Sequence, residues 1–296
     1  METIELKEVK SKSNLNITRN TRFKQEWWWR VPLHIILILG AFLMLLPFVW
    51  MLSTSLKPPE EVIAWPPNFV PNHPTMDNYF KVFEVMPFAR YFFNSLLITV
   101  VCMITICVTS SLAGYIFAIF KFPLRNFLFI IILATAIVPF ETYMIPLYLL
   151  MKELKAIDTY QGIMAPYFIM SFGIFFMRQN YIAFLPEELL DAARIDGAGE
   201  WKIYWRIVIP LSSSALAALA IYAFINVWAA FIWPLLIINS SELKTVELAL
   251  AGFQTAYTID YGPLMAGSVI SLLPILAIFI LLRRQIIESV AMTGMK

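Results

Sequence analysis

The sequence predicts an all-α integral membrane protein with six transmembrane helices. Of its 296 residues, 60% are hydrophobic and only 14% are charged, and the mean hydropathy is +0.73. These proportions exclude an ordinary soluble domain, and a net charge of +2 gives no sign of nucleic-acid binding. Six apolar runs are long enough to cross a bilayer. We place them at about residues 31–54, 92–120, 127–150, 161–182, 210–238 and 263–283.

Residues 1–30 form a polar tail in which seven Lys and Arg residues outnumber four Glu residues. The tail is too long and too polar for the charged start of a signal peptide, so we expect no cleavage. Three consecutive tryptophans, Trp27–Trp29, stand beside Arg30 and are typical of an anchor at the membrane interface. We therefore expect three parts: a tail at 1–30, a six-helix domain at 31–285 and a second tail at 286–296.

The last four apolar runs contain residues that break helices. Such breaks are tolerated in a bundle, where neighbouring helices or water satisfy the freed backbone groups. They favour a transporter-like bundle over six simple anchors, and we expect broken spans. The breaking residues are Pro139, Pro146, Pro166, Gly173, Pro234 and Pro274.

The distribution of basic residues predicts the orientation of the chain. The side that carries both termini holds 16 of the 22 Lys and Arg residues. Cytoplasmic loops carry this excess, so both termini are expected in the cytoplasm of a multi-pass protein of the cell membrane. The polar segment 186–210 then faces the cytoplasm, whereas Pro66 and Asp260 are external.

The segment 186–210, PEELLDAARIDGAGEWKIYWRIVIP, is the long polar interruption in the second half of the chain. Pro186 suits a first helical turn, and acidic residues follow it. Asp196-Gly197 signals a break. Apolar residues then recur three or four apart, as on one helix face: Trp201, Tyr204, Trp205 and Val208. We expect a short helix, a glycine turn and a second helix that returns to the membrane.

This segment resembles the EAA loop of ABC-importer permeases, in which Glu-Ala-Ala is followed at fixed spacing by Gly, Ile and Leu-Pro. The match runs through Asp191-Ala192-Ala193, Gly197, Ile207 and Ile209-Pro210, with Asp in place of Glu and Ile in place of Leu. The flanking sequence resembles the carbohydrate branch, in particular the smaller membrane subunit of maltose-type importers. The resemblance is weakest over the first ~30 residues and over the loop after the first span.

The resemblance implies that the loop docks ATPase subunits, and the residue types suit that role. Two alanines allow close approach, a carboxylate accepts hydrogen bonds from an Arg fork, and Gly197 permits a positive φ. The alternative is an amphipathic helix lying on the membrane surface. The expected docking residues are Glu188, Leu189, Asp191, Ala192, Ala193, Gly197, Ile207 and Pro210.

The resemblance also implies the partners: a homologous larger permease, two ATPase subunits, an external solute-binding protein and a sugar substrate. No Gly in the chain is followed directly by Lys, so the chain lacks the phosphate-binding motif G-x-x-x-x-G-K. We therefore expect no cofactor and no catalysis here, with ATP and Mg²⁺ held by the ATPase chains. By resemblance the loop 239–262 faces the binding protein, and the tail 286–296 reaches the ATPase interface.

Candidates for contact with the substrate are few. Glu141 is an ionisable residue inside an apolar run, where such groups are often functional. It could also cap the helix break at Pro139. Asn226 in the fifth run, with Tyr222 and Trp228 nearby, offers the amide and aromatic groups that bind sugars, although an Asn in a bundle is as often a helix contact.

Other functions remain open at this stage. Glu141 could carry a proton in a secondary transporter, the chain could import a non-sugar solute, or it could be a membrane scaffold. No metal site is expected, because His34 and His73 lie on different segments. Cys102 and Cys107 are five residues apart on a helix, which makes a disulfide between them implausible.

Overall fold

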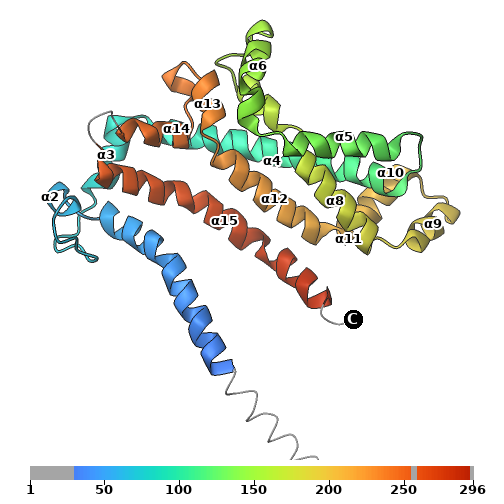
Figure 1. The fold of residues 1–296 in the computed structure, drawn as a ribbon, viewed down its shortest axis with the longest axis horizontal. Helices are drawn as coiled ribbons and strands as arrows, with labels where there is room; N and C mark the ends of the chain where they lie inside the picture. Colours follow the sequence, from blue (N-terminus) through green and yellow to red (C-terminus); the bar gives the residue numbers. More distant parts are fainter. Residues whose placement is uncertain (1–29, 255–258, 294–296) are drawn as a thin grey trace, which may run out of the picture.

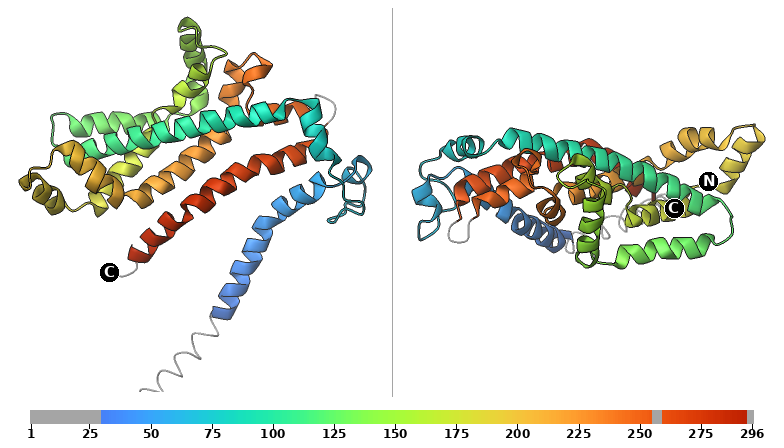
Figure 2. Two further views of the ribbon diagram at one scale, coloured as in Figure 1. Left: turned by 180° about the vertical axis from the view of Figure 1, so that it is seen from behind. Right: turned by 90° about the horizontal axis from the view of Figure 1, so that it is seen from above.

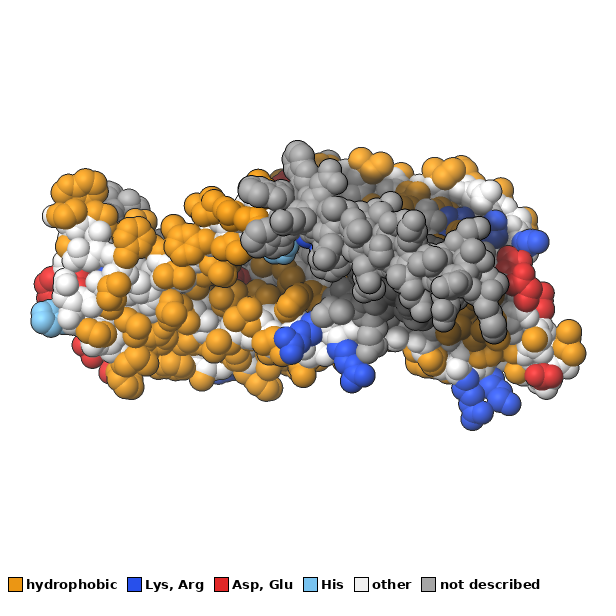
Figure 3. Space-filling model, turned by 90° about the horizontal axis from the view of Figure 1, so that it is seen from below, with side chains coloured by type: hydrophobic (Ala, Val, Ile, Leu, Met, Phe, Trp, Pro, Cys, Tyr) orange, Lys and Arg blue, Asp and Glu red, His pale blue; other side chains and the backbone are white. Residues whose placement is uncertain are grey.

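The computed structural model describes residues 30–254 and 259–293, with side chains described up to residue 285. In these ranges the chain is helical, and the β-type pairing is a single isolated bridge between Gln254 and Ile259. The predicted all-α class is confirmed. The molecule is elongated, and hydrophobic side chains cover much of the face seen in Figure 3.

In the described ranges, three helices are long and apolar enough to cross a membrane by themselves. They are Arg30–Ser55, α4 (Phe88–Ile119) and the Tyr261–Gln285 part of α15 (Tyr261–Thr293). Three further candidates are pairs of helices bent at a short break, by 99°, 41° and 77°. The described residues therefore hold six spans if each bent pair counts as one.

The third predicted span, 127–150, is not one helix. The chain forms α5 (Arg125–Ile137) and α6 (Phe140–Glu153), which meet at 99°. Val138 and Pro139 have extended backbone between them, since a residue before proline is pushed out of the helical region. Figure 1 shows α6 turning away from the line of α5. Pro146, in contrast, is accommodated inside α6.

The fourth span consists of α7 (Tyr160–Met164), the short helix η1 (Ala165–Tyr167) and α8 (Ser171–Phe184), with a bend of 41°. The fifth predicted span, 210–238, is shorter than expected. Its main helix is α12 (Ser213–Trp228), and α13 (Ile232–Ile237) follows after a break.

Helix α4 is the centre of the bundle, with α8 and α12 packed against it and α15 packed on α12. Glycines allow the close approach of α4 and α8. A Cβ on Gly173 would lie 2.3 Å from the Ser110 hydroxyl, and a Cβ on Gly114 would lie 2.8 Å from Met177. Small residues at a crossing point let membrane helices pack closely. The crossing therefore depends on these two glycines.

One end of the long axis carries α2 (Pro59–Val62), α3 (Asp77–Val85) and α14 (Val246–Leu250), with η3 (Ser241–Leu243) and η4 (Ala251–Phe253) beside α14 (Figure 1). The proline-rich connector 55–91 is fixed there, because the Asn78 amide donates to the carbonyls of Ser55 and Lys57 at 3.0 and 2.7 Å. The opposite end carries the turn between α4 and α5 and the segment 186–210.

The helix Arg30–Ser55 leaves the body of the molecule at the α2 end and diverges from it (Figures 1 and 2). Its most apolar 18-residue window has none of its residues buried inside this chain. The long apolar surface of this helix is thus available to lipid or to another subunit.

Candidate functional site

The segment 186–210 folds as the predicted helix, glycine turn and second helical stretch. Helix α9 (Glu187–Ile195) begins after Pro186 and ends at Asp196. Gly197 follows with a φ of 76°. The chain then forms α10 (Glu200–Ile203), the π-helical turn η2 (Tyr204–Val208) and α11 (Ile209–Leu211).

The end of α9 is a Schellman motif, which explains the need for glycine. The Ala198 amide donates to the carbonyl of Ala193, and the Gly197 amide donates to that of Arg194, both at 3.0 Å. No atom lies within 4 Å of a Cβ built on Gly197. The requirement is therefore for a positive φ and not for space, and the predicted positive φ is confirmed.

One face of α9 is buried and the other is open. Leu190 is completely buried and joins the main core, whereas Leu189 is 42% exposed. Ala193 is half-buried beside the same core. The remaining predicted docking residues of this helix form its exposed face: Glu188, Asp191 and Ala192.

A chain of hydrogen-bonded charges ties this loop together. Arg194 Nη1 donates to Asp191 Oδ1, and Arg194 Nε donates to Glu200 Oε1, both at 2.8 Å. Tyr115 Oη, at the end of α4, donates to Glu200 Oε2 at 3.0 Å. We call these four residues the charge relay. It joins α9, α10 and α4.

Arg194 and Glu200 each favour the charged state of the other. The hydrogen bond from Arg194 lowers the pKa of Glu200, although partial burial opposes it. The same bond is the main cause of a raised pKa at Arg194. Asp191 remains 66% exposed, so one carboxylate oxygen is still free to accept a bond from outside.

Buried tyrosines fasten the second half of the loop to the bundle. Tyr204 Oη donates to Ser111 Oγ at 2.9 Å. The Ser111 hydroxyl also lies 2.6 Å from Tyr181 Oη on α8. The Tyr115 ring lies 5.5 Å from that of Tyr204 and 6.1 Å from that of Tyr181. The second half of the loop is therefore packed directly against α4 and α8.

The predicted single face of the second helix is wrong. Tyr204 and Val208 are buried, but Trp201 and Trp205 are 66% and 56% exposed. The π-helical turn Tyr204–Val208 interrupts the regular helical spacing on which that prediction rests. Ile207 is half-buried and Pro210 is exposed, at the point where the chain turns towards α12.

The four residues considered for substrate contact do not form one site. Asn226 and Tyr222 are neighbours on the exposed side of α12, where the Asn226 amide donates to the Tyr222 carbonyl at 3.0 Å. Glu141 is exposed in the first turn of α6. Trp228 is 2% exposed and belongs to a core cluster at the α14 end, so in this structure it is a packing residue.

Sequence reasoning missed several polar partners. Trp228 Nε1 donates to Ser271 Oγ at 3.1 Å, and that hydroxyl donates to Glu247 Oε1 at 3.0 Å. Tyr115 and Glu200 of the charge relay were also missed. The spacing of Asp191 and Arg194 on one helix was a usable signal, but nothing local points from residue 200 to residue 115.

In the part of the chain that the structure describes, no group of three His, Cys, Asp or Glu residues is placed to hold a metal ion. The side chains of the tail 286–296 lie outside the described residues. Its contact with an ATPase remains a prediction.

Comparisons with known proteins identify the family. Residues 110–288 match the binding-protein-dependent transport system inner membrane component family. The chain is 36% identical to the arabinooligosaccharides transport system permease protein AraQ of Halalkalibacterium halodurans, over 86% of this chain and 92% of that protein. It is 35% identical to the lactose transport system permease protein LacG of Rhizobium radiobacter, over 86% and 93%.

The fold also matches a solved structure. A chain of a bacterial ABC transporter involved in the import of the acidic polysaccharide alginate aligns with a TM-score of 0.76 and 21% identity, covering 86% of this chain and 95% of that one. The chain therefore belongs to the family of binding-protein-dependent transport system inner membrane components, the non-catalytic permease subunits of ABC transporters.

Proposed function

We propose that this chain is a permease subunit of an ATP-driven importer of sugars or oligosaccharides, and that its 186–210 loop docks the ATPase subunits. The charge relay is the observation that carries the docking proposal. It holds the exposed face of α9 in a fixed position relative to α4. The names of the relatives support the sugar class, since two of them are transport system permeases for arabinooligosaccharides and lactose.

The proposed mechanism uses the loop as a rigid connection. When ATP binding draws the two ATPase subunits together, the docked α9 moves with them. Because Glu200 holds both Arg194 and Tyr115, and because Tyr204 packs on Tyr115, this movement is transmitted to α4. Helices α8 and α12 pack on α4 and follow it, which opens the path to the other side of the membrane.

The partners follow from the exposed surfaces. A homologous larger permease would complete the path, and the unburied helix Arg30–Ser55 offers it a long apolar contact. The binding protein would meet the end that carries α2, α3 and α14. The excess of Lys and Arg on the side of the 186–210 loop supports a cytoplasmic position for that loop and for both termini.

Purification of the tagged chain with its native partners tests the proposal. We expect ATPase subunits to be retained, and a purified binding protein to drive ATP-dependent uptake of an oligosaccharide into proteoliposomes. Uptake that follows a proton gradient without ATP would instead establish a secondary transporter. If the chain retains neither an ATPase nor any uptake activity, the scaffold alternative is correct.

A further inference from the structure

The turn between α4 and α5 carries a group of cations that have no counter-ion among the described residues. Lys121 and Arg125 lie on this turn, and Arg178 of α8 lies beside it. Among the described residues, no carboxylate lies within ion-pair distance of any of the three. We call these three residues the cation group.

Both guanidinium groups donate to backbone carbonyls around the end of α4. Arg125 Nη1 donates to the carbonyl of Phe120 at 3.2 Å, and Arg178 Nε donates to that of Phe117 at 3.1 Å. Arg178 also lies over the Phe129 ring, 4.1 Å from its centroid. Both guanidinium groups are thus tied to the backbone around the end of α4. An external anion would balance the charges of Lys121 and Arg125, which line a hollow at this turn, whereas Arg178 supports the turn from α8 without lining the hollow.

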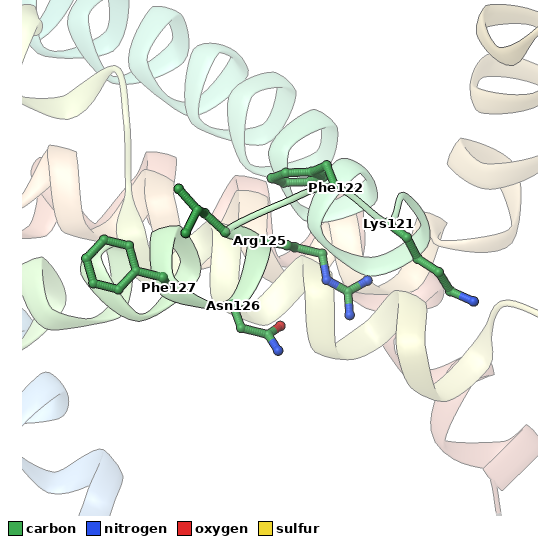
Figure 4. Close-up of a pocket in the computed structure, with 6 residues that line it drawn as sticks. Lys121, Phe122, Arg125, Asn126 and Phe127 are labelled. Atoms are coloured by element: carbon green, nitrogen blue, oxygen red, sulfur yellow. The ribbon is translucent and has the colours of Figure 1, made fainter.

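A hollow of about 310 Å³ opens on this turn. Figure 4 shows the Arg125 guanidinium and the Asn126 amide turned to the same side of the turn. The amide groups at the start of α5 have no side-chain cap and add a partial positive charge. The hollow is lined by Lys121, Phe122, Leu124, Arg125, Asn126 and Phe127.

Exposed apolar side chains continue from the hollow along α5. Leu124 is 69% exposed, Phe127 is 59% exposed and Ile131 is 45% exposed. A soluble anion would gain nothing from this surface. A phospholipid would place its phosphate among the cations and its acyl chains on the apolar residues, and Arg binds phosphate oxygens with two parallel hydrogen bonds.

We propose that the hollow between α4 and α5 binds the headgroup of an anionic phospholipid. The inference does not depend on the sugar or on the direction of transport, because it needs only this end of the bundle to lie at a membrane interface. The lipid phosphate would be held by Lys121 and Arg125, the two cations that line the hollow.

Lipid binding to the purified transporter tests this proposal. The Lys121→Gln/Arg125→Gln double variant is compared with a matched control, Lys152→Gln/Arg283→Gln, which removes the same two charges elsewhere. The probes are headgroup-labelled phosphatidylglycerol and phosphatidylcholine in detergent. We expect each lost cation of the group to weaken phosphatidylglycerol binding about fivefold, and the double variant about thirtyfold. The control should bind normally, and phosphatidylcholine should bind weakly throughout.

Three results would overturn the proposal. They are equal binding of both lipids, equal loss in the control, and full competition by inorganic phosphate alone, which would indicate a soluble-anion site. Loss of ATPase subunits from the double variant would instead identify a protein contact. The single variant Lys121→Gln leaves the hydrogen bond from Arg125 to the Phe120 carbonyl in place, so weaker phosphatidylglycerol binding by this variant would be an effect of the lost charge. ATP-driven uptake, measured in parallel, separates a failed lipid site from a failed importer hypothesis.

Discussion

Two loops at the same end of the molecule differ in whether their cations are paired with carboxylates of the chain. In the 186–210 loop, Arg194 binds two carboxylates of its own chain and the second of these binds Tyr115. In the turn between α4 and α5, the charges of Lys121 and Arg125 have no carboxylate partner among the described residues. Internal pairing makes the first loop a rigid connection to α4. The unpaired turn instead offers its charge to something outside the chain.

The largest effect is expected at the contact between the 186–210 loop and the ATPase subunit. Asp191→Arg places a positive charge next to Arg194 and against the basic ATPase side chain that the Asp191 carboxylate is expected to bind. Loss of a hydrogen-bonded charge pair at an interface costs about 2–5 kcal/mol, or roughly one to four decades in affinity. Retention of ATPase subunits on the purified permease measures this loss.

Asp191→Glu is the matched control for that change. It keeps the carboxylate and should leave both retention and uptake nearly unchanged. Asp77→Arg, a charge reversal at the far end of the molecule, should also retain the ATPase. If Asp191→Arg retains the ATPase and transports normally, α9 is a surface helix and not a docking element.

The second largest effect is expected from a change to the backbone of the 186–210 loop that leaves its charges in place. Gly197→Val forces a β-branched residue into a positive φ, which costs on the order of 1–3 kcal/mol, and should uncouple ATP hydrolysis from uptake. Gly199→Val is the control, because Gly199 has an extended backbone and open space around it. Equal behaviour of the two variants in uptake assays would show that the Schellman turn is dispensable.

A smaller effect is expected from cutting the charge relay at α4. Tyr115→Phe removes one hydrogen bond and keeps the ring in the aromatic cluster, and Glu200→Gln removes the charge that holds Arg194. Both variants should retain the ATPase, since α9 still presents Asp191. Each should hydrolyse several times more ATP per sugar imported, because loop movement reaches α4 less faithfully.

A double-mutant cycle decides whether these two residues act together. If they form one link, the double variant should lose little more coupling than either single variant. Fully additive losses, or normal coupling in both single variants, would remove the relay from the mechanism.

The sequence predicted local features well and distant pairings poorly. The glycine turn could be foreseen because Asp196-Gly197 follows a short helical pattern. The break at Pro139 was also visible, but its 99° angle depends on how α6 packs and not on the proline. Tyr115 and Glu200 meet only because α4 is long enough to bring its last turn to α10. Trp228 looked suited to a sugar, yet its burial is set by Phe224, Phe92 and α15.

The smallest effect is expected at Glu141, a further unpaired charge. It is exposed in the first turn of α6, and no hydrogen bond or ion pair to it is found among the described residues. A carboxylate that carries a proton through a membrane protein usually depends on pairing or burial for its function. Glu141 has neither among the described residues, and it does not stand in a cluster of like charges such as the one that makes the α4–α5 turn a candidate anion site. Glu141→Gln keeps the shape of the side chain, so ATP-driven uptake in proteoliposomes should stay within about twofold of normal. Uptake that is lost in this variant, and that only an imposed proton gradient restores, would favour a secondary transporter and would make Glu141 the functional charge of the molecule.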